Sequence, residues 1–172
     1  MINKFTYIDL FAGIGGFHIA MKNLGGECVF ASEWDEDCRK TYIENFKNDS
    51  PKIFIDGKPN EFFVGDITKI NPNSIPDHDV LCAGFPCQPF SSAGMQLGFD
   101  DKYGRGTLFF HIIRICKEKH PKYLLLENVK GLTQKKFADT FETMKQLLKD
   151  LGYGEIAYAV LNSKDYGIPQ NR

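Results

Sequence analysis

The sequence predicts an α/β domain that has a mostly parallel sheet with helices on both faces. Short apolar segments alternate with longer amphipathic segments along the chain, which is the order of βαβ units. A glycine cluster follows the first apolar segment, and acidic residues follow several of the others, as they do at the ligand-binding edge of open α/β sheets. The 172 residues suit one domain with a core of ordinary size.

The first strand is predicted over residues 5–11, which are rich in aromatic and β-branched side chains. Gly13, Gly15 and Gly16 follow it, and a helix then runs to the pair Gly25-Gly26. A glycine loop between a strand and a helix favours nucleotide binding, because it lets the backbone approach a ligand closely. The spacing is not that of the dinucleotide fingerprint, and tight packing of the helix on the strand is the alternative explanation.

The second strand is predicted over residues 27–32, and Glu33 stands at its end. An acidic residue about 20 positions after a glycine loop commonly binds ribose hydroxyls. Trp34, the only tryptophan, suits stacking on a purine ring, with ordinary core packing as the alternative. Asp35 is predicted to cap a helix over residues 36–46.

A small hairpin around Asp56-Gly57 and a third strand over residues 62–64 are predicted next. Asp66 follows this strand and is a second acidic group at a strand end. A carboxylate can accept a hydrogen bond from the amino group of an adenine. A cap or turn aspartate is the equally weighted alternative for Asp66.

A central strand is predicted over residues 79–83, and it leads into Gly84-Phe85-Pro86-Cys87-Gln88-Pro89-Phe90-Ser91. The two prolines exclude a helix and disfavour a central strand, so this segment is predicted to be a rigid loop at a strand end. A thiolate at Cys87 would be a nucleophile, whereas most cysteines are small buried hydrophobic residues. The rigid setting favours the nucleophile. The long glycine-containing stretch over residues 92–106 is predicted to be a functional loop, of the kind that closes over a site.

Thr107 is predicted to cap a helix that runs to Lys119, and an apolar, buried strand is predicted over residues 123–126. Glu127 leaves this strand and has the placement of a general acid, with a surface glutamate as the alternative. Beyond it, the pattern predicts a helix over residues 136–151 and a sixth strand over residues 155–161.

Charge and cysteine content exclude several classes of protein. The net charge of −1 is unfavourable for a protein that binds DNA unaided. Five cysteines without a Cys-x-x-Cys motif predict neither a disulfide scaffold nor a structural zinc site, and indicate a reduced, cytoplasmic location. No apolar stretch approaches the length of about 20 residues that spans a bilayer, so no membrane partner is expected.

Together these segments resemble the cytosine-5 DNA methyltransferases. The matching segments, in the order of the family, are Asp9-Leu10-Phe11-Ala12-Gly13-Ile14-Gly15-Gly16-Phe17, Glu33-Trp34-Asp35, Gly65-Asp66-Ile67, Gly84-Phe85-Pro86-Cys87-Gln88-Pro89-Phe90-Ser91, Gly106-Thr107-Leu108-Phe109-Phe110, Glu127-Asn128-Val129 and Gln170-Asn171-Arg172. They span nearly the whole chain. The segment around Cys87 is similar to that of the bacterial DNA enzymes, whereas the related tRNA methyltransferase usually carries a Pro-Pro-Cys variant.

The resemblance implies a Rossmann-like S-adenosylmethionine-dependent methyltransferase fold and S-adenosylmethionine as the methyl donor, with S-adenosylhomocysteine as its product. No metal is implied. The residues that would bind the cofactor are Phe11, Gly13, Gly15, Gly16, Glu33, Trp34, Asp66, Ile67, Pro86 and Leu108.

The resemblance also implies the chemistry and the substrate, a cytosine flipped out of double-stranded DNA. Cys87 would add to C6 of the base, Glu127 would bond or protonate N3, and Arg172 would position the base. Further contacts to the substrate would come from Gln88, Ser91 and Gln170. A bacterial restriction-modification system is the expected setting.

The chain departs from the family pattern at its end. Members of the family continue with a seventh strand, which lies between the fifth and the sixth, and with a target-recognition domain. Residues 1–172 are therefore expected to be an incomplete catalytic domain, completed by a second polypeptide or belonging to a longer chain. Two other functions stay open: an S-adenosylmethionine-binding subunit that is inactive without its partner, and an RNA methyltransferase. The DNA sequence that is recognised does not follow from these residues.

Overall fold

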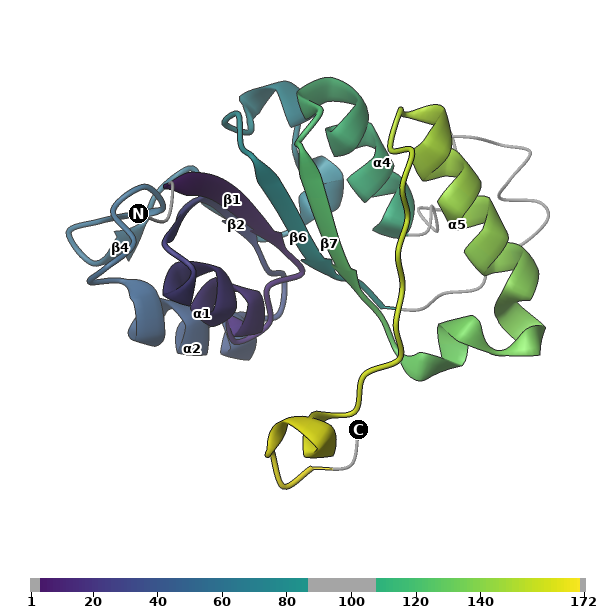
Figure 1. Cartoon of the computed structure of the whole chain (residues 1–172). Coiled ribbons are helices and arrows are strands. Elements are labelled where there is room, and N and C mark those ends of the chain that lie inside the picture. Colours follow the sequence, from purple (N-terminus) through teal and green to yellow (C-terminus); the bar gives the residue numbers. More distant parts are fainter. Residues whose placement is uncertain (1–3, 87–107, 171–172) are drawn as a thin grey trace. The chain divides into compact units, whose positions relative to one another are not determined.

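The computed structural model describes residues 4–86 and 108–170 (Figure 1). The chain forms two compact units, residues 1–129 and 130–172, and each is described by itself. The elements of the first unit are β1 (Phe5–Leu10), α1 (Gly16–Asn23), β2 (Gly26–Ser32), α2 (Glu36–Phe46), β3 (Phe54–Ile55), β4 (Lys58–Pro59), β5 (Phe63–Val64), η1 (Ile67–Lys69), η2 (Pro72–Ser74), β6 (Val80–Gly84), α4 (Leu108–Lys119) and β7 (Tyr123–Glu127). Those of the second unit are η3 (Lys130–Thr133), η4 (Lys135–Phe137), α5 (Ala138–Asp150) and η5 (Ser163–Tyr166).

The first unit is built on a five-stranded sheet of order β5-β2-β1-β6-β7, in which every pair of neighbours is parallel. All strands therefore end at the same edge of the sheet. The strand order reverses between β1 and β6, and ligands bind at such a switch point in open α/β sheets. The predicted parallel α/β architecture is confirmed, and five predicted strands lie within about two residues of their expected bounds.

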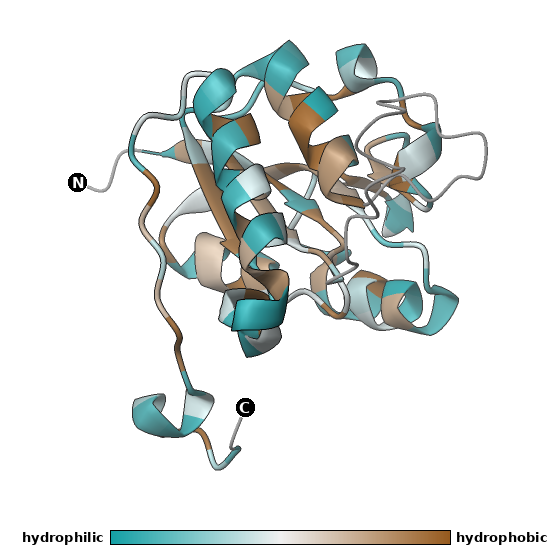
Figure 2. Cartoon of the chain, turned by 90° about the vertical axis from the view of Figure 1, so that its right-hand side faces the viewer, coloured by the Kyte–Doolittle hydropathy of each residue, from teal (hydrophilic) through white to brown (hydrophobic). Residues whose placement is uncertain are grey.

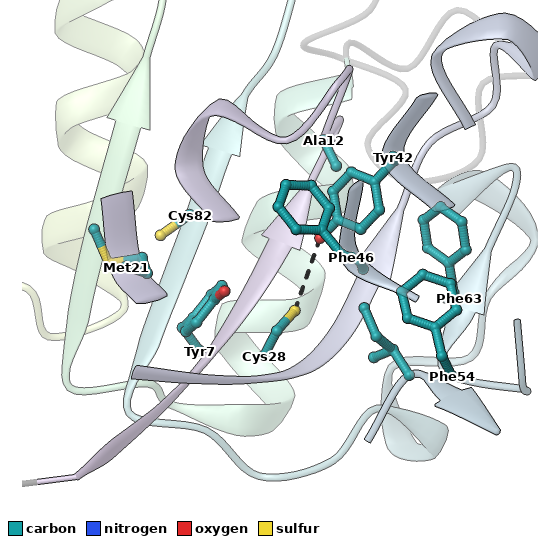
Figure 3. Packing of buried hydrophobic residues seen from close by; sticks show 11 residues of the cluster. Tyr7, Ala12, Met21, Cys28, Tyr42, Phe46, Phe54, Phe63 and Cys82 are labelled. Carbon is teal, nitrogen blue, oxygen red and sulfur yellow. Dashed lines mark hydrogen bonds between the residues drawn. The ribbon is translucent and has the colours of Figure 1, made fainter. Parts of the chain in front are cut away.

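One face of the sheet is covered by α1 and α2, and α4 lies on the other side (Figure 1). Figure 3 shows the cluster beneath α1 and α2, in which aromatic rings from the helices meet the strands. The His18 ring of α1 stacks on Phe46 of α2 at 4.0 Å between centroids, and Tyr42 of α2 stacks on Phe63 of β5 at 4.9 Å. The first contact joins α1 to α2, and the second holds the short strand β5 against α2.

On the other side, α4 buries five residues along one stripe: Phe109, Ile112, Ile113, Ile115 and Cys116. Its Phe109 ring lies 5.5 Å from that of Phe85, the residue directly after β6. Figure 2 shows how hydrophobic residues gather on the strands and on one side of the helices. The helix thus supports the end of β6, from which the segment containing Cys87 departs.

Several local predictions are confirmed. The side chain of Asp35 caps α2, because its Oδ1 accepts hydrogen bonds from Asp37 N (3.1 Å) and Cys38 N (2.9 Å). The predicted hairpin is present as β3 and β4, and Asp56 and Gly57 have the positive φ angles (50° and 72°) that a tight hairpin turn requires.

The prediction of a sixth strand over residues 155–161 is wrong. These residues belong to the second unit and pair with no other described segment, and Tyr158, Val160 and Leu161 are 66%, 52% and 65% exposed. A strand exists only when a neighbour satisfies its backbone groups, so β-rich composition alone cannot produce one.

The expectation that the apolar strand before Glu127 would be buried is also wrong for one of its faces. In β7, Tyr123 is 68% and Leu125 is 43% exposed. The strand lies at an edge of the described sheet, where β6 is its one neighbour. In the second unit, α5 buries Met144 and Leu148. Within the described ranges, the helices are too short or too polar to cross a bilayer.

Candidate functional site

The carboxyl ends of the five parallel strands bring the predicted site residues of the first unit to one edge of the sheet. Phe11 follows β1, Glu33 follows β2, Asp66 comes two residues after β5, Pro86 comes two residues after β6, and Glu127 is the last residue of β7. These residues are far apart in the sequence. The fold unites them because each strand of the sheet runs in the same direction.

The backbone between β1 and α1 has an unusual conformation. Phe11 has φ 56° and Gly13 has φ 55°, so a bulky residue and a glycine both occupy the left-handed region. This conformation is unfavourable for a bulky side chain, and such strain gathers at functional sites. The amide of Gly13 donates a hydrogen bond to Glu33 Oε2 at 2.7 Å, which joins the glycine loop to the end of β2.

The three loop glycines have different tasks. A Cβ atom on Gly15 would overlap the Phe46 ring, so Gly15 permits the close packing of α1 on α2. A Cβ atom on Gly13 or Gly16 would meet no described atom within 4 Å. Gly15 therefore serves packing, which is the alternative explanation of the glycine loop, and ligand binding at Gly13 and Gly16 stays a prediction.

Replacing Gly15 by alanine is expected to lower the free energy of unfolding by about 3 kcal/mol, from overpacking against Phe46 together with an unfavourable φ of 98°. Gly16→Ala should change it by less than about 1 kcal/mol, because its Cβ enters open space at the start of a helix. Urea unfolding of both variants measures the difference. Equal effects at the two positions would contradict the packing role of Gly15.

Glu33 and Trp34 have opposite environments. Glu33 is 9% exposed, and its Oε1 accepts from Asp35 N at 2.8 Å while its Oε2 accepts from Gly13. Each carboxylate oxygen keeps a further lone pair that can accept another hydrogen bond. Trp34 is 79% exposed, which excludes core packing and presents a flat apolar ring beside Glu33.

Asp66 caps the short helix η1, as its alternative explanation predicted. Its Oδ1 accepts from Thr68 N (2.9 Å) and Thr68 Oγ1 (2.7 Å), and Lys69 Nζ lies 3.6 Å from Oδ2. The hydrogen bonds from Thr68 lower the pKa of Asp66, so it is a carboxylate at neutral pH. Capping uses Oδ1, and Oδ2, which faces Lys69, keeps lone pairs that can accept a further hydrogen bond. Ile67 is 4% exposed, and Leu108 is half-buried at the start of α4.

The ends of β6 and β7 are fitted to each other. Gly84 pairs with Glu127 in the parallel ladder, and a Cβ atom on Gly84 would lie 3.4 Å from Glu127 Oε2. The Asn128 side chain donates from Nδ2 to the carbonyl oxygen of Phe85 at 2.8 Å. The carboxylate of Glu127 therefore stands beside the strand end that leads through Pro86 to Cys87. Glu127 itself is exposed, which agrees with the alternative of a surface glutamate.

Four of the predicted site residues, Cys87, Gln88, Ser91 and Arg172, lie outside the described residues, as do Thr107 and the predicted loop over residues 92–106. Pro86 is exposed at the end of β6. Gln170 belongs to the second unit, where its carbonyl accepts from Ser163 Oγ at 2.6 Å. Within the described ranges, no three or more side chains of His, Cys, Asp or Glu are grouped as metal ligands would be.

Two residues that contact the site have no predicted role. Asn128 is part of the Glu127-Asn128-Val129 segment, and its bond to Phe85 joins two strand ends that are 43 residues apart. Arg39 bonds the backbone at the ends of β2 and β5. No sequence pattern indicates either contact, because both are made to backbone carbonyls.

The model of the C-5 cytosine-specific DNA methylase family matches residues 5–172. The chain belongs to this family. Type II methyltransferase M.HhaI of Haemophilus parahaemolyticus is 48% identical over 166 residues, which cover 96% of the chain and 46% of that protein. M.HpaII of Haemophilus parainfluenzae is 51% identical over 172 residues, which cover 98% of the chain and 44% of that protein. The chain therefore spans about half the length of the curated relatives that it matches.

Solved structures show the same fold. The S. pombe Dnmt2 methyltransferase superposes with a TM-score of 0.69 at 22% identity, over 99% of this chain and 47% of that one. A putative DNA modification methyltransferase encoded within an E. coli prophage superposes with a TM-score of 0.60 at 25% identity, over 84% and 38% of the two chains. The family resemblance and the Rossmann-like methyltransferase fold predicted from the sequence are confirmed.

Proposed function

We propose that this chain is the catalytic region of a DNA cytosine-5 methyltransferase, acting in the bacterial cytoplasm within a restriction-modification system. The observation that carries the proposal is the juxtaposition of the Glu127 carboxylate with Gly84, at the strand end that leads to Cys87. A nucleophile and a proton donor from neighbouring strand ends are the two groups that addition to a cytosine ring needs.

The residues at the strand ends fit S-adenosylmethionine as the cofactor. Glu33 would accept bonds from the ribose hydroxyls, Asp66 would accept from the adenine amino group, and the exposed ring of Trp34 would cover the purine. The open backbone at Gly13 and Gly16 would admit the methionine part. When bound, this cofactor supplies an electrophilic methyl group.

The side chains of the chain would activate the cytosine. The thiolate of Cys87 adds to C6, and the displaced ring electrons are stabilised because Glu127 bonds or protonates N3. C5 then becomes nucleophilic enough to accept the methyl group. Loss of the C5 proton restores the ring double bond and expels the thiolate. Flipping the base from the helix costs a few kcal/mol, and Gln88, Ser91, Gln170 and Arg172 are proposed to hold it.

We further propose that polypeptide beyond residues 1–172, either a continuation of the chain or a second chain, completes the enzyme. The exposed apolar side chains on β7, the unpaired segment over residues 155–161, and the coverage of about half of each relative support this proposal. The net charge of −1 also agrees, because the additional part would carry much of the contact with DNA phosphates. We call the chain together with the polypeptide encoded directly downstream the complemented enzyme.

Covalent trapping tests the proposal. A duplex containing 5-fluorocytosine, incubated with S-adenosylmethionine, should become attached to the complemented enzyme, because fluorine at C5 blocks the elimination that releases Cys87. The Cys87→Ser variant should give no adduct and should transfer no labelled methyl group to ordinary DNA. Cofactor binding without an adduct in the complemented enzyme would favour the alternative, an inactive S-adenosylmethionine-binding subunit. Methyl transfer to tRNA in place of DNA would overturn the choice of substrate.

A further inference from the structure

Arg39 on α2 reaches the point where β2 and β5 end. Its Nη1 donates to the carbonyl oxygen of Glu33 at 3.0 Å and to that of Val64 at 2.5 Å. The guanidinium carbon lies 4.5 Å from the centroid of the Phe63 ring, and a Cβ atom on Gly65 would lie 4.0 Å from Nη1. One side chain therefore contacts the backbones of two neighbouring strands at the same edge of the sheet.

The pairing between β2 and β5, whose ends Arg39 bridges, involves few residues. Strand β5 contains two residues, which pair with Ala31 and Ser32 of β2. Two backbone hydrogen bonds flank this pairing, from Ala31 N to the Phe62 carbonyl at 2.8 Å and from Glu33 N to the Val64 carbonyl at 3.1 Å. A two-residue edge strand has few backbone bonds to fix its position, and packing of the Phe63 ring on Tyr42 does not fix where its last carbonyl lies, so the bonds of Arg39 add to those that hold the end of β5.

Glu33 and Asp66 are the two acidic residues proposed to bind the nucleoside part of the cofactor. Glu33 is itself a residue whose carbonyl Arg39 bonds, and Asp66 comes two residues after Val64. A shift of β5 along β2 would change the separation of the two carboxylates. Both must meet one rigid nucleoside, so a small change of separation would weaken its binding.

The environment of Arg39 agrees with a role in positioning the backbone. Partial burial lowers its pKa, and the neighbouring carboxylates of Glu33 and Glu36 offset part of this shift. The hydrogen bonds of the guanidinium are made to carbonyl oxygens, and its face lies against an aromatic ring. A lysine has one compact ammonium group, which can donate two hydrogen bonds as Nη1 does but cannot reproduce the stacking of a planar guanidinium on the Phe63 ring.

We propose that Arg39 is a positioning residue for the nucleoside half of S-adenosylmethionine, acting through Glu33 and Asp66 without touching the cofactor. This inference rests on the proposed function. It adds a specific expectation. Asp66 would accept a hydrogen bond from the adenine amino group, so Arg39 should determine how strongly the site prefers this amino group over a carbonyl oxygen at the same position.

The test measures ligand binding by the full 172-residue chain through the fluorescence of Trp34, the single tryptophan, which is 79% exposed. The ligands are S-adenosylhomocysteine and S-inosylhomocysteine, in which an oxygen replaces the amino group. Arg39→Met should weaken binding of S-adenosylhomocysteine about tenfold, the effect of losing hydrogen bonds from a charged donor. Lys40→Met is the matched control, since Lys40 is exposed and pairs with Asp37, and its effect should stay within about twofold.

Comparison of the two ligands separates positioning from general loss of structure. The wild-type chain should prefer S-adenosylhomocysteine, and Arg39→Met should lose most of this preference while the Lys40→Met variant keeps it. Arg39→Lys, which retains the charge, should have a ligand preference between those of the wild-type chain and Arg39→Met. It replaces Arg39→Met in the test if that variant does not fold. An unchanged affinity and preference in folded Arg39 variants would overturn the inference alone. Failure of the wild-type chain and of the complemented enzyme to bind S-adenosylhomocysteine would overturn the proposed function.

Discussion

Replacing Glu127 by glutamine is expected to slow methyl transfer by the complemented enzyme about a thousandfold, within the usual range for a general acid. The substitution keeps the size of the side chain and its place at the end of β7, where Gly84 is its ladder partner. It removes the group that would bond or protonate N3 of the cytosine. Affinity for S-adenosylhomocysteine should stay within about twofold, because Glu127 lies on a different strand from Glu33 and Asp66.

Single-turnover methyl transfer, together with binding of S-adenosylhomocysteine, measures this effect. The matched control is Glu118→Gln on α4, which removes an exposed carboxylate away from the strand ends. A loss of less than about tenfold for Glu127→Gln would contradict the assignment of Glu127 as the acid. Equal losses for both variants would indicate a general effect of charge.

Substitutions at Gly84 test the same assignment sterically, because they can displace the Glu127 carboxylate without removing it. An alanine Cβ at 3.4 Å from Glu127 Oε2 and 3.7 Å from Phe17 Cε2 would be in ordinary contact, so Gly84→Ala should leave activity within about threefold. The additional methyl groups of Gly84→Val would displace the carboxylate, and a misplacement of about 1 Å costs about a hundredfold in rate. This graded response would distinguish displacement of Glu127 from a general requirement for glycine.

The sequence predicts the strand ends well, because each depends on local signals. Asp35, Asp66 and the glycine loop follow short apolar segments directly, and a parallel sheet necessarily gathers such residues at one edge. The segment over residues 155–161 was predicted incorrectly for a physical reason. Its composition suits a strand, but pairing requires a partner that composition does not reveal.

The contacts of side chains with backbone carbonyls are the part of the site that could not be predicted from the sequence. The bond from Asn128 to Phe85 and those from Arg39 to Glu33 and Val64 join segments that meet only in the folded chain. An acceptor carbonyl exists at every position, so no residue type marks the partner. In an ion pair or a pair of catalytic groups, both partners are recognisable side chains. In these contacts only the donor is a side chain, so the acceptor cannot be recognised from the sequence.

The acid stability of the fold should depend on His18, which is 1% exposed beneath α1 and α2. Its Nδ1 lies 2.6 Å from the Tyr42 hydroxyl and its Nε2 lies 3.0 Å from Ser50 Oγ. Burial lowers the pKa of His18 to about 4, an effect that the nearby Asp49 carboxylate partly opposes. The unfolded chain therefore binds a proton at a higher pH than the folded chain, and the stability that His18 contributes is present above about pH 6.5 and lost as the pH falls through 4.

This difference predicts a loss of about 3 kcal/mol in the free energy of unfolding between about pH 7 and pH 4. Urea unfolding across this range measures it. His18→Gln should be less stable at neutral pH, because it disrupts the cluster, but its stability should depend less on pH. His120→Gln, which changes an exposed histidine after α4, is the control and should keep the pH dependence of the wild-type chain. A steep acid response that persists in His18→Gln would assign the effect to other groups.

Asp9 is expected to change the stability of the fold with pH in the direction opposite to His18. It is 0% exposed, and neither of its oxygens has a hydrogen-bond partner of normal geometry among the described residues. Burial raises its pKa well above that of an unfolded aspartate, and the charge of Glu33 adds to this shift. Its contribution is therefore complete below about pH 4 and is lost as the pH rises. Because the two slopes have opposite signs, Asp9→Asn should reveal a steeper acid response than the wild-type chain shows, and an unchanged or shallower response would contradict this account of the core.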